Sequence, residues 1–402
     1  MKNKLIIIIT VLFLLFPATG NSCSMYKITK NGKTFVGNNE DFLSPNNQFW
    51  FEVADFDKKF GVMYMGRLNN FAQGAINEAG LVFDGFANDN LPITNTAGKT
   101  KISIVKALRH IMQSMDTVEE VKAYIETIDL SFLSSSMLVF VDKTGAYLIA
   151  EGEELITGDE SEKSFSNFYY SQIKDLKDVD IPRFQKGQRF LNSTEAKASL
   201  DYCSQVMDNM KTENSEVTST QFSTIYDLTS LKIRVYLYTD FTEYVELDLK
   251  KELKKGDHKT MMIDLFPKNK KSIARTYYSK YNDTNNPVLF LQEKMNPEQY
   301  SEKELKNKGV AWGLTVIGYE WLKDKKDPET AIKVFKYGIK LMPNYYDLYD
   351  SLGEAYFDKR DWNNSIKNYA KALALNPFNN NAIKKIQECK ENRDKLNKKN
   401  NH

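Results

Sequence analysis

The sequence of 402 residues predicts an α+β fold followed by an all-α region. Three observations lead to this prediction. Apolar runs are paired as hairpins around turn residues, helix patterns stand between those hairpins, and a stretch near the C-terminus repeats every 34 residues. Hairpins separated by helices favour α+β over the regular strand–helix alternation of a parallel sheet. The length is enough for two or three domains.

Residues 1–22 have the pattern of an export signal. Two lysines precede the apolar run 5–16, and small residues follow it. These features are typical of a secretory signal peptide, and the run is too short for a permanent membrane span. We expect cleavage after Gly20 or after Ser22, and a mature protein that is periplasmic or extracellular. A lipoprotein anchored at Cys23 is the less favoured alternative.

Composition excludes several classes of function. Apolar residues make up 42% of the chain and charged residues 27%, as in soluble globular proteins. The leader holds two of the 55 basic residues, and the remaining 53 match the 53 acidic ones. A neutral chain predicts no nucleic-acid partner and no anionic membrane surface. With 3 His, 3 Cys and no paired-cysteine motif, we expect no metal and no cofactor.

Residues 23–267 are predicted to form the domain of mixed strands and helices. Asn31-Gly32 separates two apolar stretches and is a strong signal for a hairpin. Thr117, with Glu120 three residues later, predicts a helix that continues to about Ile128. Further strands are expected at 137–141, 146–150, 222–228, 231–239 and 244–249.

The C-terminal third divides into three parts. The polar segment 268–306 is predicted to be a linker. Residues 307–378 match at a period of 34 and predict two tetratricopeptide (TPR) repeats, with a capping helix and basic tail at 379–402. The first repeat is one residue out of step near Trp321, so we expect an extra residue in its inter-helix turn. Coincidental amphipathic helices are the alternative, and the repeats would offer a surface for a protein partner.

Cys23 directly follows the expected signal. A cut after Ser22 makes Cys23 the new N-terminus, with an α-amine whose ordinary pKa is about 7.7–8.0. That amine can take the thiol proton without a histidine. The alternative is a disulfide between Cys23 and Cys203 in an oxidising compartment.

Short motifs after Cys23 resemble those of the choloylglycine hydrolase superfamily of N-terminal nucleophile (Ntn) hydrolases. That superfamily includes bile salt hydrolases, penicillin V acylases and acid ceramidase relatives. The motifs follow the family order over about 240 residues: Cys23-Ser24, 37–42 (GNNEDF), 77–81 (NEAGL), 166–168 (SNF), 182–184 (PRF) and 226–228 (YDL). The resemblance implies a four-layer αββα Ntn-hydrolase sandwich in which Cys23 opens a central strand.

The resemblance also implies catalytic roles for four matching residues. Cys23 is the nucleophile, and Asp41 accepts hydrogen bonds from its α-amine. Asn167 donates its side-chain amide to the oxyanion, and Arg183 supplies positive charge near the thiolate. Arg189 is the alternative arginine if the alignment is shifted. A turn cap, a loop cap and a surface ion pair are the plain structural alternatives for Asp41, Asn167 and Arg183.

Two more positions belong to the expected site. The second oxyanion donor is expected to be a backbone N–H near Ala87 or Asn88. Asn38 stands where the family usually has arginine, so it offers a neutral amide to the substrate instead of a charge. Its neighbours Asn39 and Glu40 either line the pocket or are solvated turn residues.

The sequence therefore predicts an exported cysteine Ntn hydrolase that cleaves a linear, non-peptide amide through an acyl-enzyme on Cys23. An acyltransferase on the same site and an inactive hydrolase fold serving as a scaffold are the alternatives. The substrate is a small N-acyl amide; bile-acid, phenoxyacetyl and fatty-acyl amides and signalling lactones all remain open. Five aromatic residues form either an acyl pocket or core: Phe42, Phe49, Trp50, Phe51 and Tyr64.

Overall fold

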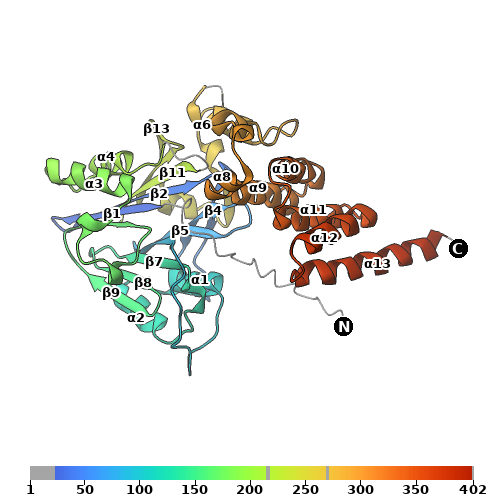
Figure 1. The fold of residues 1–402 in the computed structure, drawn as a ribbon. Helices are drawn as coiled ribbons and strands as arrows, with labels where there is room; N and C mark the ends of the chain where they lie inside the picture. The colour runs from blue at the N-terminus through green and yellow to red at the C-terminus, as the bar shows by residue number, and fades with distance from the viewer. Residues whose placement is uncertain (1–22, 214–217, 269–270, 401–402) are drawn as a thin grey trace.

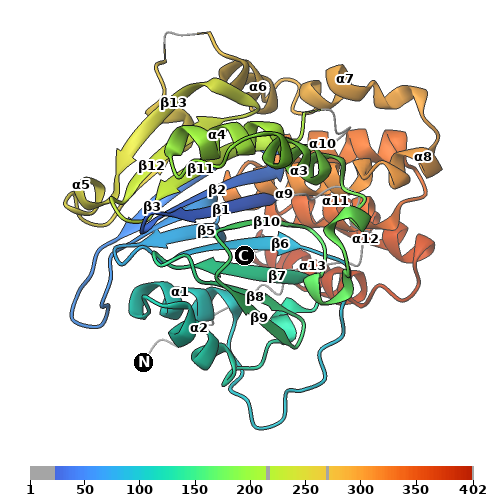
Figure 2. The same cartoon turned by 90° about the vertical axis from the view of Figure 1, so that its left-hand side faces the viewer.

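The computed structural model describes residues 23–213, 218–268 and 271–400. The predicted signal segment 1–22 lies outside these residues. Within them, the strands form two antiparallel sheets, one of six strands and one of eight, and helices lie outside both (Figures 1 and 2). The predicted α+β class is confirmed. Among the described residues, no helix is both long and apolar enough to cross a bilayer.

The six-stranded sheet has the order β10-β1-β2-β11-β12-β13. Its strands are β1 (Ser24–Lys30), β2 (Lys33–Phe42), β10 (Glu162–Ser166), β11 (Ser219–Asp227), β12 (Lys232–Leu237) and β13 (Asp240–Asp248). The predicted hairpin at Asn31-Gly32 joins β1 to β2. Both turn residues have positive φ, 55° and 71°, as a two-residue hairpin turn requires.

The eight-stranded sheet has the order β14-β3-β4-β5-β6-β7-β8-β9. Its strands are β3 (Asn47–Glu52), β4 (Val62–Arg67), β5 (Ala72–Asn77), β6 (Val82–Ala87), β7 (Ser136–Val141), β8 (Tyr147–Glu151), β9 (Glu154–Gly158) and β14 (His258–Met261). The NEAGL motif is the turn between β5 and β6. Its Asn77 side chain accepts from the Ala79 and Leu81 N–H groups and donates to the Met112 and Met115 carbonyls, so this motif is structural.

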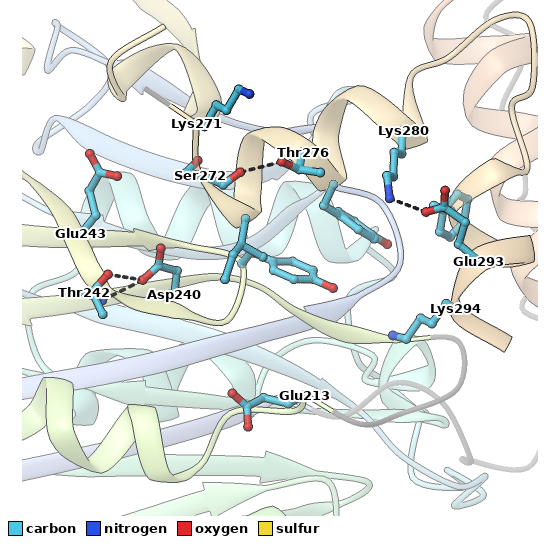
Figure 3. A pocket seen from close by; sticks show the side chains of 14 residues that line it. Glu213, Asp240, Thr242, Glu243, Lys271, Ser272, Thr276, Lys280, Glu293 and Lys294 are labelled. Atoms are coloured by element: carbon cyan, nitrogen blue, oxygen red, sulfur yellow. Dashed lines mark hydrogen bonds and ion pairs between the residues drawn. The ribbon is translucent and has the colours of Figure 1, made fainter. Parts of the chain in front are cut away.

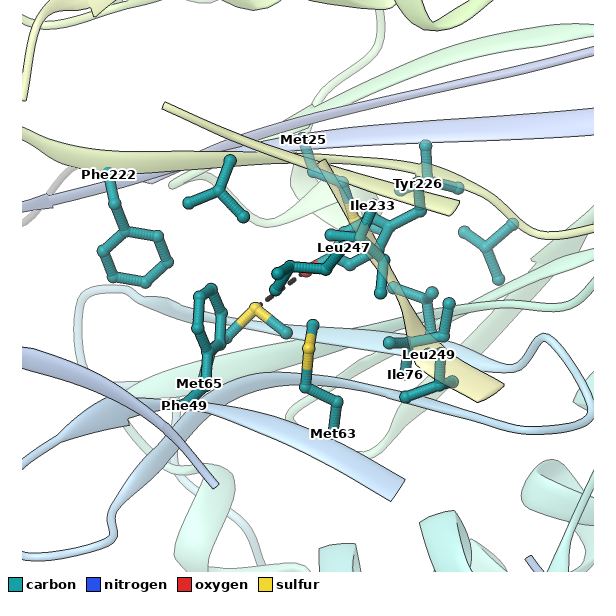
Figure 4. Packing of buried hydrophobic residues seen from close by; sticks show 14 of the residues in the cluster. Met25, Phe49, Met63, Met65, Ile76, Phe222, Tyr226, Ile233, Leu247 and Leu249 are labelled. Atoms are coloured by element: carbon teal, nitrogen blue, oxygen red, sulfur yellow. Dashed lines mark hydrogen bonds between the residues drawn. The ribbon is translucent and has the colours of Figure 1, made fainter. Parts of the chain in front are cut away.

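Four layers result, because helices cover the outer face of each sheet. On the eight-stranded sheet lie α1 (Ile104–Ser114) and α2 (Val118–Ile125), and on the six-stranded sheet lie α3 (Pro182–Ser193) and α4 (Leu200–Asn209). Helix α5 (Leu249–Leu253) follows β13. The inner faces of the sheets pack on each other through an apolar core that includes Met25, Phe49, Met65 and Tyr226 (Figure 4).

The five aromatic residues considered for an acyl pocket do not share one location. Phe49 and Phe51 lie between the sheets, whereas Trp50 and Tyr64 lie under α1 and α2. Phe42 packs against the C-terminal helices. Side chains alternate between the faces of a strand, so neighbours in the sequence are buried in different layers.

Helices make up the C-terminal region. They are α6 (Ile273–Tyr281), α7 (Leu289–Met295), α8 (Glu302–Asn307), α9 (Val310–Tyr319), α10 (Pro328–Leu341), α11 (Tyr346–Asp358), α12 (Trp362–Leu375) and α13 (Asn380–Asn400). The segment 268–306, expected to be a polar linker, thus contains α6, α7 and all but the last residue of α8. Several of its apolar side chains are buried: Tyr281, Phe290 and Leu291 pack in one cluster with Phe42 and Leu43. The polar average composition of the segment gave no sign of these buried apolar side chains.

The repeat positions form the same contact twice. A Cβ added at Gly318 would lie 2.2 Å from the Phe335 ring, and one added at Gly353 would lie 2.9 Å from the Tyr369 ring. Each glycine lets an aromatic residue of the next helix approach closely. The extra residue of the first unit lies in a π-helical turn, Glu320–Asp324, that extends α9, and not in the inter-helix turn where we expected it.

Candidate active site

Cys23 immediately precedes β1 and lies beside Glu40 of β2. The register pairs Ser24 with Asn39, and alternation then places Cys23 and Glu40 on the face between the sheets. The Cys23 Sγ donates to Glu40 Oε2 at 3.4 Å, and the Asp41 backbone N–H donates to the same sulfur. Cys23 is only 7% exposed. Burial, first, and the nearby carboxylates raise the pKa of its thiol well above the usual value.

Arg183 brings the four predicted catalytic residues together. It extends from the first turn of α3 and is nearly buried, with 12% of its side chain exposed. Its Nη2 donates to three oxygens: the Cys23 carbonyl at 3.2 Å, Ser166 Oγ at 2.9 Å and Asn167 Oδ1 at 3.0 Å. Its Nε lies 3.7 Å from Asp41 Oδ2. Arg183 therefore does not form a surface ion pair, which was the structural alternative for this residue.

Asp41 is a buried carboxyl at the end of β2, and not a turn cap. It accepts from Thr220 Oγ1 at 2.6 Å and from Thr212 Oγ1. Burial raises the pKa of Asp41 to about 6, although the Arg183 charge acts in the opposite direction. The other arginine considered, Arg189, is exposed on α3.

The groups that could donate to an oxyanion are not all the ones that we expected. Asn167 Nδ2 donates to the Ala87 carbonyl at 2.7 Å, which leaves its second amide proton for another acceptor. The Asn88 backbone N–H donates to the Ser135 carbonyl at 3.0 Å and is therefore occupied. The Asn88 side-chain amide, in contrast, is buried, and neither of its polar atoms has a hydrogen-bond partner among the described residues. The free donor at this position is the side chain.

Glu40 forms a carboxyl pair with Asp84 of β6, which the sequence did not reveal. Asp84 Oδ1 accepts from the Gly85 N–H at 2.9 Å, whereas its buried Oδ2 has no hydrogen-bond partner among the described residues. Asn38 Nδ2 donates to Glu40 Oε1 at 3.3 Å, and Gln73 Nε2 donates to Glu40 Oε2 at 2.6 Å. Burial raises the pKa of both carboxyls, that of Glu40 to about 7. Because Glu40 is buried on a strand, the solvated-turn alternative is wrong.

A β-bulge directs Gln73 toward Glu40. Between β4 and β5, Met65 pairs with Gly74 and Gly66 pairs with Ala72, so Gln73 is the extra residue. Gly66 has a φ of 156°, and a Cβ there would lie 2.1 Å from the Phe71 carbonyl oxygen, so this position requires glycine. Bulges of this kind redirect side chains beside active sites.

Positive charge reaches the site from β4 and not from position 38. The Asn38 amide is held within the fold, since its oxygen accepts from Thr224 Oγ1. Arg67 stacks on the Phe42 ring at 3.7 Å, and its charge acts on Glu40 and Cys23. Its Nε is buried and has no hydrogen-bond partner among the described residues. Burial lowers the pKa of Arg67.

The cysteines of the described chain, Cys23, Cys203 and Cys389, are all free and buried, so the Cys23–Cys203 disulfide is absent. Cys203 lies on α4, where it packs in the cluster between that helix and the six-stranded sheet. No group of three or more His, Cys, Asp or Glu side chains in the described ranges could hold a metal ion.

A separate pocket of about 840 Å³ lies beside α6 and α7 (Figure 3). Asp240 at the start of β13, Lys280 on α6 and Lys294 on α7 are among its lining residues. Lys280 forms an ion pair with Glu293, and Lys294 donates to Ser219 Oγ at 2.7 Å. The described lining includes none of the predicted site residues, so this pocket is distinct from the surroundings of Cys23.

No protein-family model and no curated protein matches the chain. Solved structures similar to it include the following two. A mutant conjugated bile acid hydrolase from Clostridium perfringens is 16% identical with a TM-score of 0.48, and the match covers 63% of this chain and 98% of that chain. Penicillin V acylase from Agrobacterium tumefaciens is 14% identical with a TM-score of 0.44, and the match covers 57% of this chain and 86% of that chain.

Proposed function

We propose that the protein is an exported cysteine Ntn hydrolase of the choloylglycine hydrolase type, which cleaves a linear, non-peptide amide bond. The main support is the position of Arg183. It hydrogen-bonds the Cys23 carbonyl and Asn167 and lies beside Asp41, so one nearly buried guanidinium contacts residues from three separate segments. An arginine in a simple surface ion pair would not make this set of contacts.

In the proposed reaction the Cys23 sulfur attacks the amide carbonyl carbon. Asn167 and the free side-chain amide of Asn88 donate to the oxyanion, and removal of one such donor typically lowers the rate by about 10²–10³. The amine leaves, and a thioester remains on Cys23. Water then releases the acid, with the α-amine of Cys23 carrying protons in both half-reactions. Asp41 and Arg183 hold the first residue in place.

We also propose that residues 307–378 are two TPR repeats. The glycine–aromatic contacts at Gly318 and Gly353 recur at equivalent positions, which supports a repeated helix pair. Export is proposed from the leader sequence alone, which places the enzyme in the periplasm or outside the cell. The repeats would offer a docking surface for a protein partner there.

The proposed function is tested by trapping the acyl-enzyme. Mature protein is mixed with a conjugated bile acid, a phenoxyacetyl amide, a long-chain N-acyl amide and an acyl lactone, quenched in acid, and weighed intact by mass spectrometry. We expect one substrate to add its acyl mass to Cys23. Cys203→Ala is the matched control and should retain the added mass, whereas Cys23→Ala should lose both the mass and the turnover. Equal turnover by Cys23→Ala would contradict the proposal.

A further inference from the structure

We propose that Glu40 is a second acid–base group at Cys23, which takes the thiol proton as the sulfur attacks, and that the buried carboxyl of Asp84 is a positioning residue whose charge acts on both groups. This inference rests on the proposed function, in which Cys23 is the nucleophile. It assigns a catalytic role to one residue and a positioning role to another that the family resemblance does not mark.

The geometry of Glu40 meets the requirement for a general base. Its Oε2 accepts the hydrogen bond of the Cys23 thiol at 3.4 Å, so the proton is already directed toward the carboxyl. Glu40 and Cys23 are 1% and 7% exposed. The adjacent residues Ser24 and Asn39 are paired in the register of β1 and β2, which holds Cys23 and Glu40 side by side.

The charged and titratable groups around Glu40 come from four strands and from Cys23, which precedes β1. The strand residues are Asp41 on β2, Arg67 on β4, Asp84 on β6 and Tyr226 on β11. Arg67 favours the ionised form of Glu40, whereas burial and Asp41 oppose it. Asn38 and Gln73 donate to the two oxygens of Glu40. Burial and the Glu40 charge raise the pKa of Asp84, and the Asp84 charge in turn raises the pKa of the Cys23 thiol.

Glu40 would accept the thiol proton when the α-amine of Cys23 is protonated. Asp41 is expected to contact that amine, and an adjacent carboxylate favours the ammonium form. An ammonium group cannot accept the thiol proton, but it can protonate the leaving nitrogen. Glu40 can accept the proton, so the two groups divide the work between them.

The steps balance with this division. The thiol proton moves to Glu40, the C–S bond forms, and the carbonyl electron pair moves to oxygen. When the C–N bond breaks, the leaving nitrogen takes a proton from the α-ammonium. Water then gives a proton to the α-amine and attacks the thioester carbon. The C–S bond breaks, and the sulfur takes its proton back from Glu40, which restores the starting state.

Two measurements on the mature full chain test this assignment. The first is the pH dependence of iodoacetamide alkylation at Cys23, followed by peptide mass spectrometry, which needs no substrate. The second is the pH dependence of kcat/KM. In Glu40→Gln we expect the alkylation profile to lose one ionisation and to move to lower pH, because a carboxylate no longer opposes the thiolate. We also expect kcat/KM to fall by about 10²–10⁴-fold, the usual range for a general base.

Asp84→Asn separates positioning from mere packing. The substitution removes a charge that opposes the Cys23 thiolate and nearly keeps the size of the side chain, so the rising limb of both profiles should shift to lower pH. Glu162→Gln, at the opposite end of β1, is the control and should leave both profiles unchanged. Circular dichroism verifies that each variant is folded.

The outcomes distinguish this inference from the proposed function. If Glu40→Gln and Asp84→Asn both leave the alkylation and kcat/KM profiles in place, Glu40 takes no part in proton transfer, even if Cys23 forms the acyl-enzyme. A second outcome is that alkylation depends on Glu40 as expected while Cys23→Ala retains full turnover. In that case Glu40 does act on the Cys23 thiol, and the hydrolase assignment fails. A misfolded Glu40→Gln protein leaves the Asp84→Asn shift to decide.

Discussion

The surroundings of Cys23 and the C-terminal helices differ in the kind of side chain that they bury. In the helices, glycine meets an aromatic ring, as Gly318 meets Phe335, and the interior gains close packing. Around Cys23, the same depth of burial is given to carboxyls such as Glu40 and Asp84. Taking charged groups out of water is unfavourable unless they are paired, and here each carboxyl opposes the other.

This difference indicates which region serves stability and which serves chemistry. Substitutions in the helices should change the free energy of unfolding and leave catalysis intact. Substitutions around Cys23 should change catalysis, and some should make the protein more stable, because active sites often hold unfavourable arrangements. The following predictions test that division, from the largest expected effect to the smallest.

Cys23→Ser should abolish activity with almost no effect on folding. The substitution keeps the size of the side chain but replaces the sulfur that attacks the substrate, so we expect kcat/KM to fall by about 10⁴-fold or more. The free energy of unfolding, measured by urea titration, should change by less than about 1 kcal/mol. A strongly destabilised variant would mean that Cys23 is mainly a packing residue.

Asn167→Ala should lower kcat by about 10²–10³-fold, which is typical for the loss of one oxyanion donor. KM should change little, since the donor acts mainly in the transition state. Steady-state kinetics measure both constants. Asn88→Ala is the companion variant, and a similar loss there identifies its free amide as the second donor. Unchanged kcat in both variants would remove the oxyanion role from this part of the site.

Glu40→Gln should stabilise the folded protein at alkaline pH. Burial raises the pKa of Glu40 above the value of an unfolded chain, so between the two values the folded chain holds a proton that the unfolded chain has lost. The free energy of unfolding of the wild type therefore falls as the pH rises from about 4.5 to 7. At pH 8 we expect Glu40→Gln to be more stable by on the order of 2 kcal/mol, and at pH 4 to show no gain. Urea titrations at both pH values measure this, and a loss of stability at pH 8 would contradict the account.

Gly318→Ala should destabilise the C-terminal helices by about 1–2 kcal/mol without changing kcat. The new Cβ would meet the Phe335 ring at 2.2 Å, and overpacking typically costs about 1–3 kcal/mol, partly offset by the better helix propensity of alanine. The double variant Gly318→Ala with Phe335→Leu should recover part of the loss. Differential scanning calorimetry reports the change. An equal loss in the double variant would show that the ring contact is not the cause.

Local patterns predicted the elements well and the site only in part. The Asn31-Gly32 hairpin and the Thr117 helix start appear where expected, because a turn and a cap depend on a few adjacent residues. Helix α2 ends at Ile125 and not at Ile128, since the chain continues in tighter turns, with hydrogen bonds from Thr127 N–H to the Tyr124 carbonyl and from Ile128 N–H to the Ile125 carbonyl.

The missed residues depend on contacts between distant strands. Gln73 reaches Glu40 only because a bulge shifts the register of β4 and β5, and Asp84 meets Glu40 across the space between the two sheets. Arg67 brings positive charge to Glu40 and Cys23 from another strand. The isolated Gly66 in an apolar run was the one local signal of the bulge. No periodicity in the sequence reports such cross-strand contacts.

The central claim is that Cys23 acts as an N-terminal nucleophile. The most direct test is the intact mass and N-terminal sequence of protein exported by its own leader, compared with Cys23→Ala. We expect the wild type to begin at Cys23 and the variant to keep Asn21-Ser22 or more. A wild-type chain that begins at Asn21 would leave Cys23 without a free amine, and that result would contradict the account.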